Sequence, residues 1–365
     1  MKRVLFVDDE RIILKKLKNI FITGNVNYDF INDGSRVMDF MASNKVDLVC
    51  LDMHMGPVKG IDLLRKLQET YPNTMRIAMV DFANGRISKD LHEENLVHHT
   101  ILKPWSDEEI KEDVEKILQT QTSLYEKSML TFIEKIDALP TLPDIYNTIS
   151  MQIVNHDSIA TISKTIEEDL SLTAFVLKIA NSAMYGRSTG NVAQAVMKIG
   201  LSNLKDIVLS YSVFNFLGKG KDDLEKIWTK AISVNNLLKM FYEKCLDQEM
   251  PDTYGSVGLL HDIGELFLLT YKEKYGCKIN LDYPTHENLG GYMLNQWGLP
   301  LPYVEGAMFH HRPNDKRIIH KNLILALFVV HDLIEGYDDQ KMVELVYNKL
   351  GLDKEDVVSS LKEYL

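Results

Sequence analysis

Three carboxylates and one lysine stand directly after short apolar runs in the first third of the chain. Asp8 and Asp9 follow one run, Asp52 follows a second and Lys103 follows a third. In an open parallel sheet, residues just beyond the carboxyl ends of the strands meet at one edge, where ligands bind. Carboxylates gathered there repel one another unless a hard cation such as Mg²⁺ lies among them. One carboxylate could then attack a phosphoryl donor to form an acyl phosphate, while Lys103 pairs with the phosphate oxygens.

A second concentration of reactive side chains lies near the C-terminus. Of the 11 histidines, those after residue 260 are His261, His286, His310, His311, His320 and His331, and His261 directly precedes Asp262. Imidazoles combined with a few carboxylates are the usual ligands of Fe, Mn, Ni and Zn. Any one of these histidines taken alone is more often a surface residue or a hydrogen-bonded core residue. The prediction of a metal site therefore depends on the group.

The first 120 residues alternate short apolar runs with amphipathic stretches, which predicts a doubly wound α/β fold with a parallel sheet. The strands are expected at 3–7, 28–31, 47–51, 75–80 and 98–102. Helical patterns lie between them, at 12–20, 36–43 and 61–70. This order would bring the three acidic residues and Lys103 to one rim of the sheet.

From residue 139 onward, strand patterns are rare. Leucines and isoleucines instead recur at spacings of three and four, at 159–166, 172–180, 192–199, 204–211 and 323–334. Proline and glycine residues separate these stretches. The spacing is typical of amphipathic helices, so this part is predicted to be all-α.

Residues 107–136 contain no glycine or proline, and apolar residues repeat there at intervals of seven. Two interpretations remain open. One is a single long helix that joins two domains and offers a short coiled-coil seam for a homodimer. The other is the last helix of the first domain, a polar joint at 119–123, and then a new helix.

Composition excludes several functional classes. The chain has 41 Lys+Arg against 52 Asp+Glu and a net charge of −11, so it lacks the basic surface of nonspecific nucleic-acid binding. No stretch approaches the roughly 18–20 apolar residues that span a bilayer, and the first apolar run is too short for a signal peptide. The 3 cysteines are too few for a disulfide framework. We therefore expect a cytoplasmic protein without nucleic-acid or membrane partners.

The runs VDDE, LDMHMGPVKG and LKPW together resemble the receiver domain of two-component response regulators over about residues 1–120. The resemblance implies a flavodoxin-like fold, phosphorylation by a sensor histidine kinase and bound Mg²⁺. By this resemblance Asp52 is the phosphoacceptor, and Asp8, Asp9 and Lys103 complete the active site. Mg²⁺ would be held by Asp9, Asp52 and the backbone carbonyl of His54, and the Lys103–Pro104 bond would be cis.

Two positions depart from the receiver pattern. Val80 stands where the hydroxyl residue that senses the phosphoryl group is usual, and Thr100 stands where an aromatic switch residue is usual. Phosphate chemistry is therefore expected to persist, with its conformational readout weakened or rerouted.

The second half resembles an HDOD domain, a relative of the metal-dependent HD phosphohydrolases. The matching runs include LPTLPDI, EEDLSLTAFVLKIANSAMYG and GLLHDIGELFLL. The resemblance implies an all-helical, non-catalytic signalling module with a vestigial metal site for a transition metal. Its ligand positions are His261, Asp262, His286, His310, His311 and Asp332.

Two charges oppose catalysis at that site. Lys230 replaces the histidine expected as the first ligand and could pair with Asp262, and Glu265 replaces a lysine usual in cyclic di-GMP phosphodiesterases. The favoured interpretation is a receiver (1–120), a helical linker (121–138) and an HDOD domain (139–365) that presents a surface to a downstream signalling protein. The alternatives are a phosphohydrolase or cyclic di-GMP phosphodiesterase, and a domain that binds a metal or ligand without turnover.

Overall fold

The protein is described by a computed structural model. The residues it describes are 2–21, 26–56, 59–81, 91, 96–135, 144–181, 189–217, 222–275, 284–336 and 339–361. The chain divides into two compact units. The first contains Met1–Glu126 with the segment Leu294–Leu301, and the second contains Lys127–Met293 with Pro302–Leu365.

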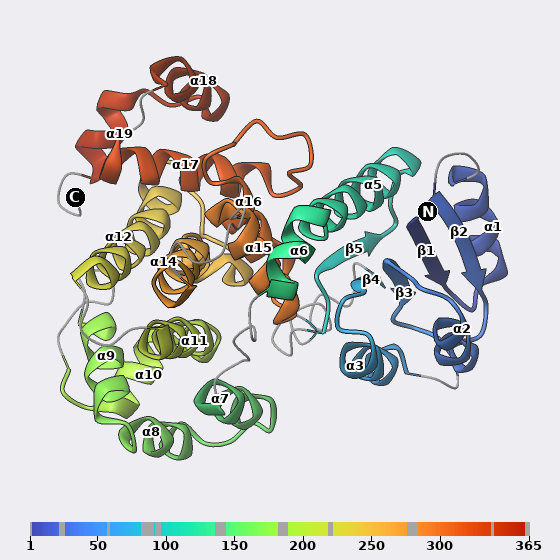
Figure 1. Ribbon diagram of the computed structural model, residues 1–365, viewed down its shortest axis with the longest axis horizontal. Helices are drawn as coiled ribbons and strands as arrows, with labels where there is room; N and C mark the ends of the chain where they lie inside the picture. Colours follow the sequence, from blue (N-terminus) through green and yellow to red (C-terminus); the bar gives the residue numbers. More distant parts are fainter. Residues whose placement is uncertain are drawn as a thin grey trace. The chain divides into compact units, whose positions relative to one another are not determined.

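A five-stranded parallel sheet forms the centre of the first unit, with strand order β2-β1-β3-β4-β5 (Figure 1). The strands are β1 (Lys2–Val7), β2 (Val26–Ile31), β3 (Leu48–Asp52), β4 (Met75–Asp81) and β5 (His99–Lys103). All five predicted strands are confirmed, and the order is that of the flavodoxin-like doubly wound fold.

Helices cover both faces of this sheet because successive strand side chains point to opposite faces. The helices are α1 (Arg11–Ile20), the 3-10 turn η1 (Gly34–Arg36), α2 (Val37–Ser43), α3 (Gly60–Thr70) and α5 (Asp107–Leu124). Leu5, Val7 and Leu51 belong to a buried cluster with residues of α2 and α3, which lie on the same side of the sheet in Figure 1. On the opposite face, the ring of Phe6 lies 4.9 Å from that of Phe21 at the end of α1.

The first residue of α3 is a glycine for a steric reason. A Cβ atom at Gly60 would lie 2.9 Å from the carbonyl oxygen of Asp52, closer than real side chains approach. Glycine therefore allows α3 to begin directly beside the end of β3.

The helical stretch after the sheet is broken. α5 begins at a capping box formed by Ser106 and Glu109, ends at Leu124, and is followed by α6 (Lys127–Lys135). The structure therefore has two helices, with the joint at 125–126 instead of the predicted 119–123. Ile110 and Ile117 are seven residues apart and so belong to the repeat that predicted a seam, and both are completely buried within the chain.

The second unit is helical throughout its described residues, as predicted. Its helices are α6, α7 (Asp144–Val154), α8 (Ile159–Glu167), α9 (Leu170–Ala180), α10 (Val192–Ile199), α11 (Leu201–Leu217), α12 (Asp222–Lys244), α13 (Val257–Leu260), α14 (Ile263–Tyr275), α15 (His286–Gln296), α16 (Leu301–Phe309), α17 (Lys321–Glu335), α18 (Gln340–Leu350) and α19 (Lys354–Leu361), with a 3-10 turn η4 (Asp252–Tyr254). The last residues of α15 and the first of α16 fall in the segment counted with the first unit.

Close helix packing positions the histidines of this unit. α12 packs against α13 and α17. At the start of α14, a Cβ atom at Gly264 would lie 1.8 Å from the carbonyl oxygen of His286. Only glycine permits α14 and α15 to approach this closely, and the approach brings His286 toward Asp262. None of the helices that the structure describes is both long enough and apolar enough to cross a membrane.

Candidate functional site

The rim of the sheet assembles the predicted receiver site. Lys103 Nζ lies 2.8 Å from Asp52 Oδ1 and 3.0 Å from Asp8 Oδ2. Asp9 Oδ2 accepts a hydrogen bond of 2.8 Å from the N–H of Gly56, which ties the loop after β3 to the acidic pair. The Lys103–Pro104 bond is cis, as the resemblance implied.

Burial and charge compete at this rim. Desolvation raises the pKa of Asp8 above its ordinary value, although the hydrogen bond and charge of Lys103 act in the opposite direction. Burial also disfavours the charge on Lys103, but Asp52 and Asp8 outweigh it and raise the pKa of that ammonium. The site therefore holds more negative charge than Lys103 alone neutralises.

The carboxylates fit a hard divalent cation. Asp8, Asp9 and Asp52 each offer an oxygen, and these three oxygens lie within 4.8 Å of one another. Oxygen donors of this kind, completed by water, are the ligands that Mg²⁺ prefers. Asp8, Asp9 and Asp52 would hold it. The backbone carbonyl of His54 remains a predicted ligand.

At the end of β4, the residue that lies at the rim of the sheet is not Val80, which the sequence predicted there. Val80 is completely buried and belongs to the core cluster beneath the sheet, so its side chain does not reach the rim. The next residue, Asp81, ends β4, pairs in register with Lys103 and has a half-exposed side chain. Its Oδ2 lies 3.2 Å from Nδ1 of His54. Thr100 lies within β5, opposite Ala78.

The second unit gathers most of the predicted histidines around one carboxylate, Asp262. On one side, Asp262 Oδ1 lies 3.0 Å from His310 Nε2 and 3.6 Å from His286 Nε2. On the other side, Asp262 Oδ2 lies 3.3 Å from His261 Nε2 and 3.8 Å from His331 Nε2. The two carboxylate oxygens thus face two separate groups of ligands.

Lys230 occupies the Oδ2 side. Its Nζ lies 2.5 Å from Asp262 Oδ2 and 2.8 Å from Glu335 Oε1, which confirms the pairing expected from the sequence. Burial disfavours the ammonium, but the charges of Asp262 and Glu335 outweigh it and raise the pKa of Lys230. Burial alone would raise the pKa of Asp262, yet His261 and His310 hold it well below its ordinary value. Asp262 is therefore a buried carboxylate with a permanent cationic neighbour.

The Oδ1 side has a different character. His286, His310 and His311 each offer a nitrogen within 4.8 Å of the others and of Asp262. Desolvation lowers the pKa of all three, that of His311 to about 2 with help from the neighbouring His310. Neutral imidazoles are the form that ligates metals.

A hydrogen bond from the ring of His310 to the backbone supports the same assignment. Nδ1 of His310 lies 2.9 Å from the carbonyl oxygen of Ala307, to which it donates, while Nε2 faces Asp262 Oδ1 and His286 Nε2 at 3.0 and 3.3 Å. The Oδ1 side thus fits one transition metal held by Asp262, His286, His310 and His311. The Oδ2 side does not fit one, because the ammonium of Lys230 lies there.

One predicted ligand lies elsewhere. Asp332 pairs with Lys354 at 2.9 Å and does not reach the cluster, whereas its neighbour His331 does. Adjacent residues of a helix point about 100° apart, so α17 can direct only one of the two inward. His331 and Glu335, four residues apart, share the inward face. His331 is one of the six histidines singled out in the sequence, but the ligand positions implied by the HDOD resemblance include neither His331 nor Glu335. Their helical spacing could have identified both.

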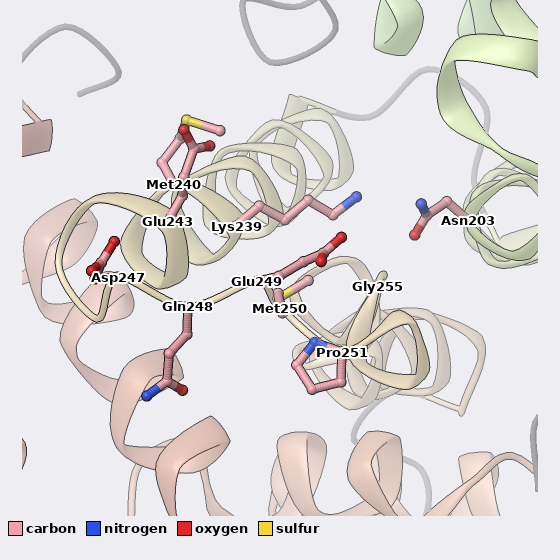
Figure 2. Close-up of a pocket in the computed structure, with 10 residues that line it drawn as sticks. All are labelled: Asn203, Lys239, Met240, Glu243, Asp247, Gln248, Glu249, Met250, Pro251 and Gly255. Carbon is pink, nitrogen blue, oxygen red and sulfur yellow. The ribbon is translucent and has the colours of Figure 1, made fainter. Parts of the chain in front are cut away.

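The second unit also contains a separate cavity of about 520 Å³ (Figure 2). Lys239 of α12 and Glu249 extend into it, and Asn203 of α11 lies opposite. The remaining lining residues are Met240, Glu243, Asp247, Gln248, Met250, Pro251 and Gly255. None of the residues predicted to do chemistry lines it.

Comparison with known proteins agrees with this two-part architecture. Residues 4–115 match the response regulator receiver domain, and residues 139–285 match the HDOD domain. An uncharacterized protein of Treponema pallidum is 25% identical over 252 residues, covering 64% of this chain and 48% of that protein. The transcriptional regulatory protein CpxR of Escherichia coli is 27% identical over 119 residues, covering 33% of this chain and 50% of CpxR. The chain thus spans about half the length of these relatives.

A solved structure from Shewanella amazonensis, named as a metal-dependent phosphohydrolase, shares the fold of the helical part. It is 19% identical, has a TM-score of 0.52 and covers 69% of this chain and 98% of that chain. The protein therefore has an N-terminal response regulator receiver domain and a C-terminal, HD-like HDOD domain. A receiver domain implies a cognate histidine kinase.

Proposed function

We propose that this protein is a cytoplasmic signalling protein in which phosphorylation of Asp52 by a sensor histidine kinase controls a non-catalytic HDOD domain. The HDOD domain would present a surface to a downstream signalling protein. The observation that carries the second part of this proposal is the ion pair between Lys230 and Asp262.

The receiver geometry supports phosphoryl transfer to Asp52. A carboxylate oxygen of Asp52 attacks the phosphorus of the donor, the new O–P bond forms, and the leaving group departs with the electrons of the broken bond. Lys103, 2.8 Å from Asp52, is placed to accompany the phosphoryl oxygens. When bound, Mg²⁺ would supply the positive charge that this rim lacks.

The HDOD geometry argues against hydrolysis. Metal-dependent hydrolysis requires a metal with an open coordination position that activates water. Lys230 is a fixed cation at Asp262 Oδ2, where it neutralises the carboxylate and repels a second cation. Glu265 adds a negative charge nearby, and burial together with the charge of Asp262 raises its pKa. A phosphodiester substrate would meet this carboxylate instead of a cationic group.

A second candidate function rests on the Oδ1 side of the cluster. Asp262, His286, His310 and His311 form a four-residue set that fits one transition metal. This set supports a phosphohydrolase or cyclic di-GMP phosphodiesterase with a reduced metal complement, or a domain that binds metal without turnover. The fold shared with the Shewanella protein is compatible with each of these activities.

Elemental analysis of the full-length protein, purified without chelators or a His tag, separates the candidates. We expect no stoichiometric transition metal and no hydrolysis of cyclic di-GMP or of a chromogenic phosphodiester. Turnover that is lost in Asp262→Asn would overturn the non-catalytic assignment. One metal per chain without turnover would instead identify a metal-binding signalling domain. Separately, acetyl phosphate should label the wild-type protein and not Asp52→Asn.

A further inference from the structure

The topology places a fourth acidic residue at the phosphoryl site. β4 lies between β3, which ends at Asp52, and β5, which ends at Lys103. Asp52 pairs in register with Met79, and Asp81 pairs with Lys103. Because side chains alternate along a strand, Asp52, Met79, Asp81 and Lys103 all point to the same face. Asp81 therefore stands between the phosphoacceptor strand and the lysine strand, two residues beyond the level of Asp52.

The contacts of Lys103 sharpen this placement. Lys103 lies beside Asp81 in the register, and its side chain extends across the end of β4. Its ammonium therefore lies 2.8 Å from Asp52 and 3.0 Å from Asp8. Because Asp52 is the last residue of β3, a phosphoryl group added to it would lie beyond that strand end, toward the level of Asp81 and Lys103. The Asp81 side chain is 49% exposed, and its Oδ2 lies 3.2 Å from Nδ1 of His54, in the loop that follows Asp52.

We infer that Asp81 limits phosphorylation of this receiver, because it holds a fixed negative charge beside the position that the phosphoryl group takes on Asp52. The inference rests on the proposed role of Asp52 as phosphoacceptor. In the unphosphorylated protein, Lys103 pairs with Asp8 and Asp52, Mg²⁺ would offset further negative charge when bound, and His54 pairs with Asp81. Phosphorylation adds negative charge where Asp81 already contributes one. Asp81 is thus a residue that sets how stably the phosphorylated form is populated.

The size of the effect follows from Coulomb's law. Two unit charges about 7 Å apart, at an effective dielectric constant of about 40 to 80, change a binding constant by about three- to eightfold. Neutralising Asp81 should strengthen binding of a phosphoryl analogue by this factor.

Beryllofluoride, which binds a phosphoacceptor carboxylate as a phosphoryl analogue, is a direct probe. Its binding to the full-length protein in Mg²⁺ can be followed by the ¹⁹F resonance of the bound species. Asp81→Asn should bind it about three- to eightfold more tightly than the wild type, and Asp81→Glu, which keeps the charge, should not. The matched control is Asp113→Asn, because Asp113 also pairs with a histidine, His99 at 3.4 Å, at the opposite end of β5.

His54→Gln distinguishes charge from the loss of the His54–Asp81 contact. This variant keeps the Asp81 charge and removes its partner, so binding should be equal to or weaker than that of the wild type. Tighter binding in His54→Gln than in the wild type would overturn the inference, as would equal affinities of wild type and Asp81→Asn. If no variant gives a signal that depends on Asp52, phosphorylation itself is refuted, and the role of Asp81 with it. Binding by Asp81→Asn alone would support the inference most strongly.

Discussion

Replacement of Lys230 by methionine tests whether its ammonium is the counterion of Asp262. The two side chains are 14% and 2% exposed, so water screens their attraction poorly. Removal of one member of a buried ion pair costs about 3–5 kcal/mol, since the remaining charge is left uncompensated. Protonation of a neighbouring imidazole can recover part of this loss. We therefore expect Lys230→Met to lower the free energy of unfolding by about 2–4 kcal/mol at pH 8, and Tm by about 5–15 °C.

The pH dependence of this loss provides a second signature. In the wild type, burial lowers the pKa of His286, His310 and His331, so the unfolded chain binds more protons and stability decreases as the pH falls below about 6.5. In Lys230→Met, the uncompensated carboxylate should raise the pKa of a nearby imidazole in the folded state. The resulting stabilisation is present below the unfolded pKa and is lost as the pH rises. The difference between variant and wild type should therefore be smaller at pH 6 than at pH 8.

Urea unfolding followed by far-ultraviolet circular dichroism at both pH values measures this difference. Lys244→Met is the matched control, because Lys244 pairs with Glu243 at an exposed site, where the side chains are 44% and 60% exposed. Its effect should be within about 0.5 kcal/mol of zero. A loss in Lys230→Met no larger than in this control would refute the counterion role, as would a loss that does not depend on pH.

Further substitutions test the remaining parts of the structure. Asp8→Asn should raise Tm at pH 7 in the absence of Mg²⁺. Burial raises the pKa of this carboxyl, so its ionisation above about pH 4 destabilises the fold. Thermal unfolding that shows no gain in Tm at pH 7, or an equal gain at pH 3, would contradict this. Gly264→Ala should lower stability by more than about 2 kcal/mol, since its Cβ would lie 1.8 Å from the His286 carbonyl oxygen, whereas Gly190→Ala meets no atom within 4 Å and should have little effect. Equal unfolding midpoints for the two glycine variants would show that α14 and α15 can separate without cost.

The receiver site was predictable from the sequence because strand ends alone determine it. Asp8, Asp52 and Lys103 each directly follow an apolar run, and the parallel order of the strands brings these ends to one rim. The interpretation of Val80 was wrong because the end of β4 was placed one residue too early. The apolar run continues through Val80, but alternation directs Val80 into the core and leaves Asp81 at the rim. An error of one residue at the end of a strand exchanges the two faces of the sheet.

The cluster around Asp262 was less predictable because residues in or beside five separate helical segments build it. Sequence resemblance identified His261, His286, His310 and His311, yet it selected Asp332 over His331. That choice depends on the rotation of α17 about its axis, which packing against α12 and α18 determines. The contact between Lys230 and Glu335 likewise joins residues more than 100 positions apart and has no local pattern.

Retention of metal-ligand residues in this domain has a structural explanation that does not require catalysis. Nδ1 of His261 lies 2.7 Å from the carbonyl oxygen of Gly258, and Nδ1 of His310 lies 2.9 Å from that of Ala307. Both histidines directly follow the last residue of a helix, α13 or α16, where carbonyl groups have no partner within the helix. These imidazoles satisfy the ends of two helices while their other nitrogens face Asp262. Loss of either histidine would remove a hydrogen bond to a buried carbonyl whether or not a metal binds, so both histidines contribute to the stability of the fold. Lys230 then balances the charge of Asp262 at the centre of this arrangement, so these residues have a structural role that does not depend on a metal.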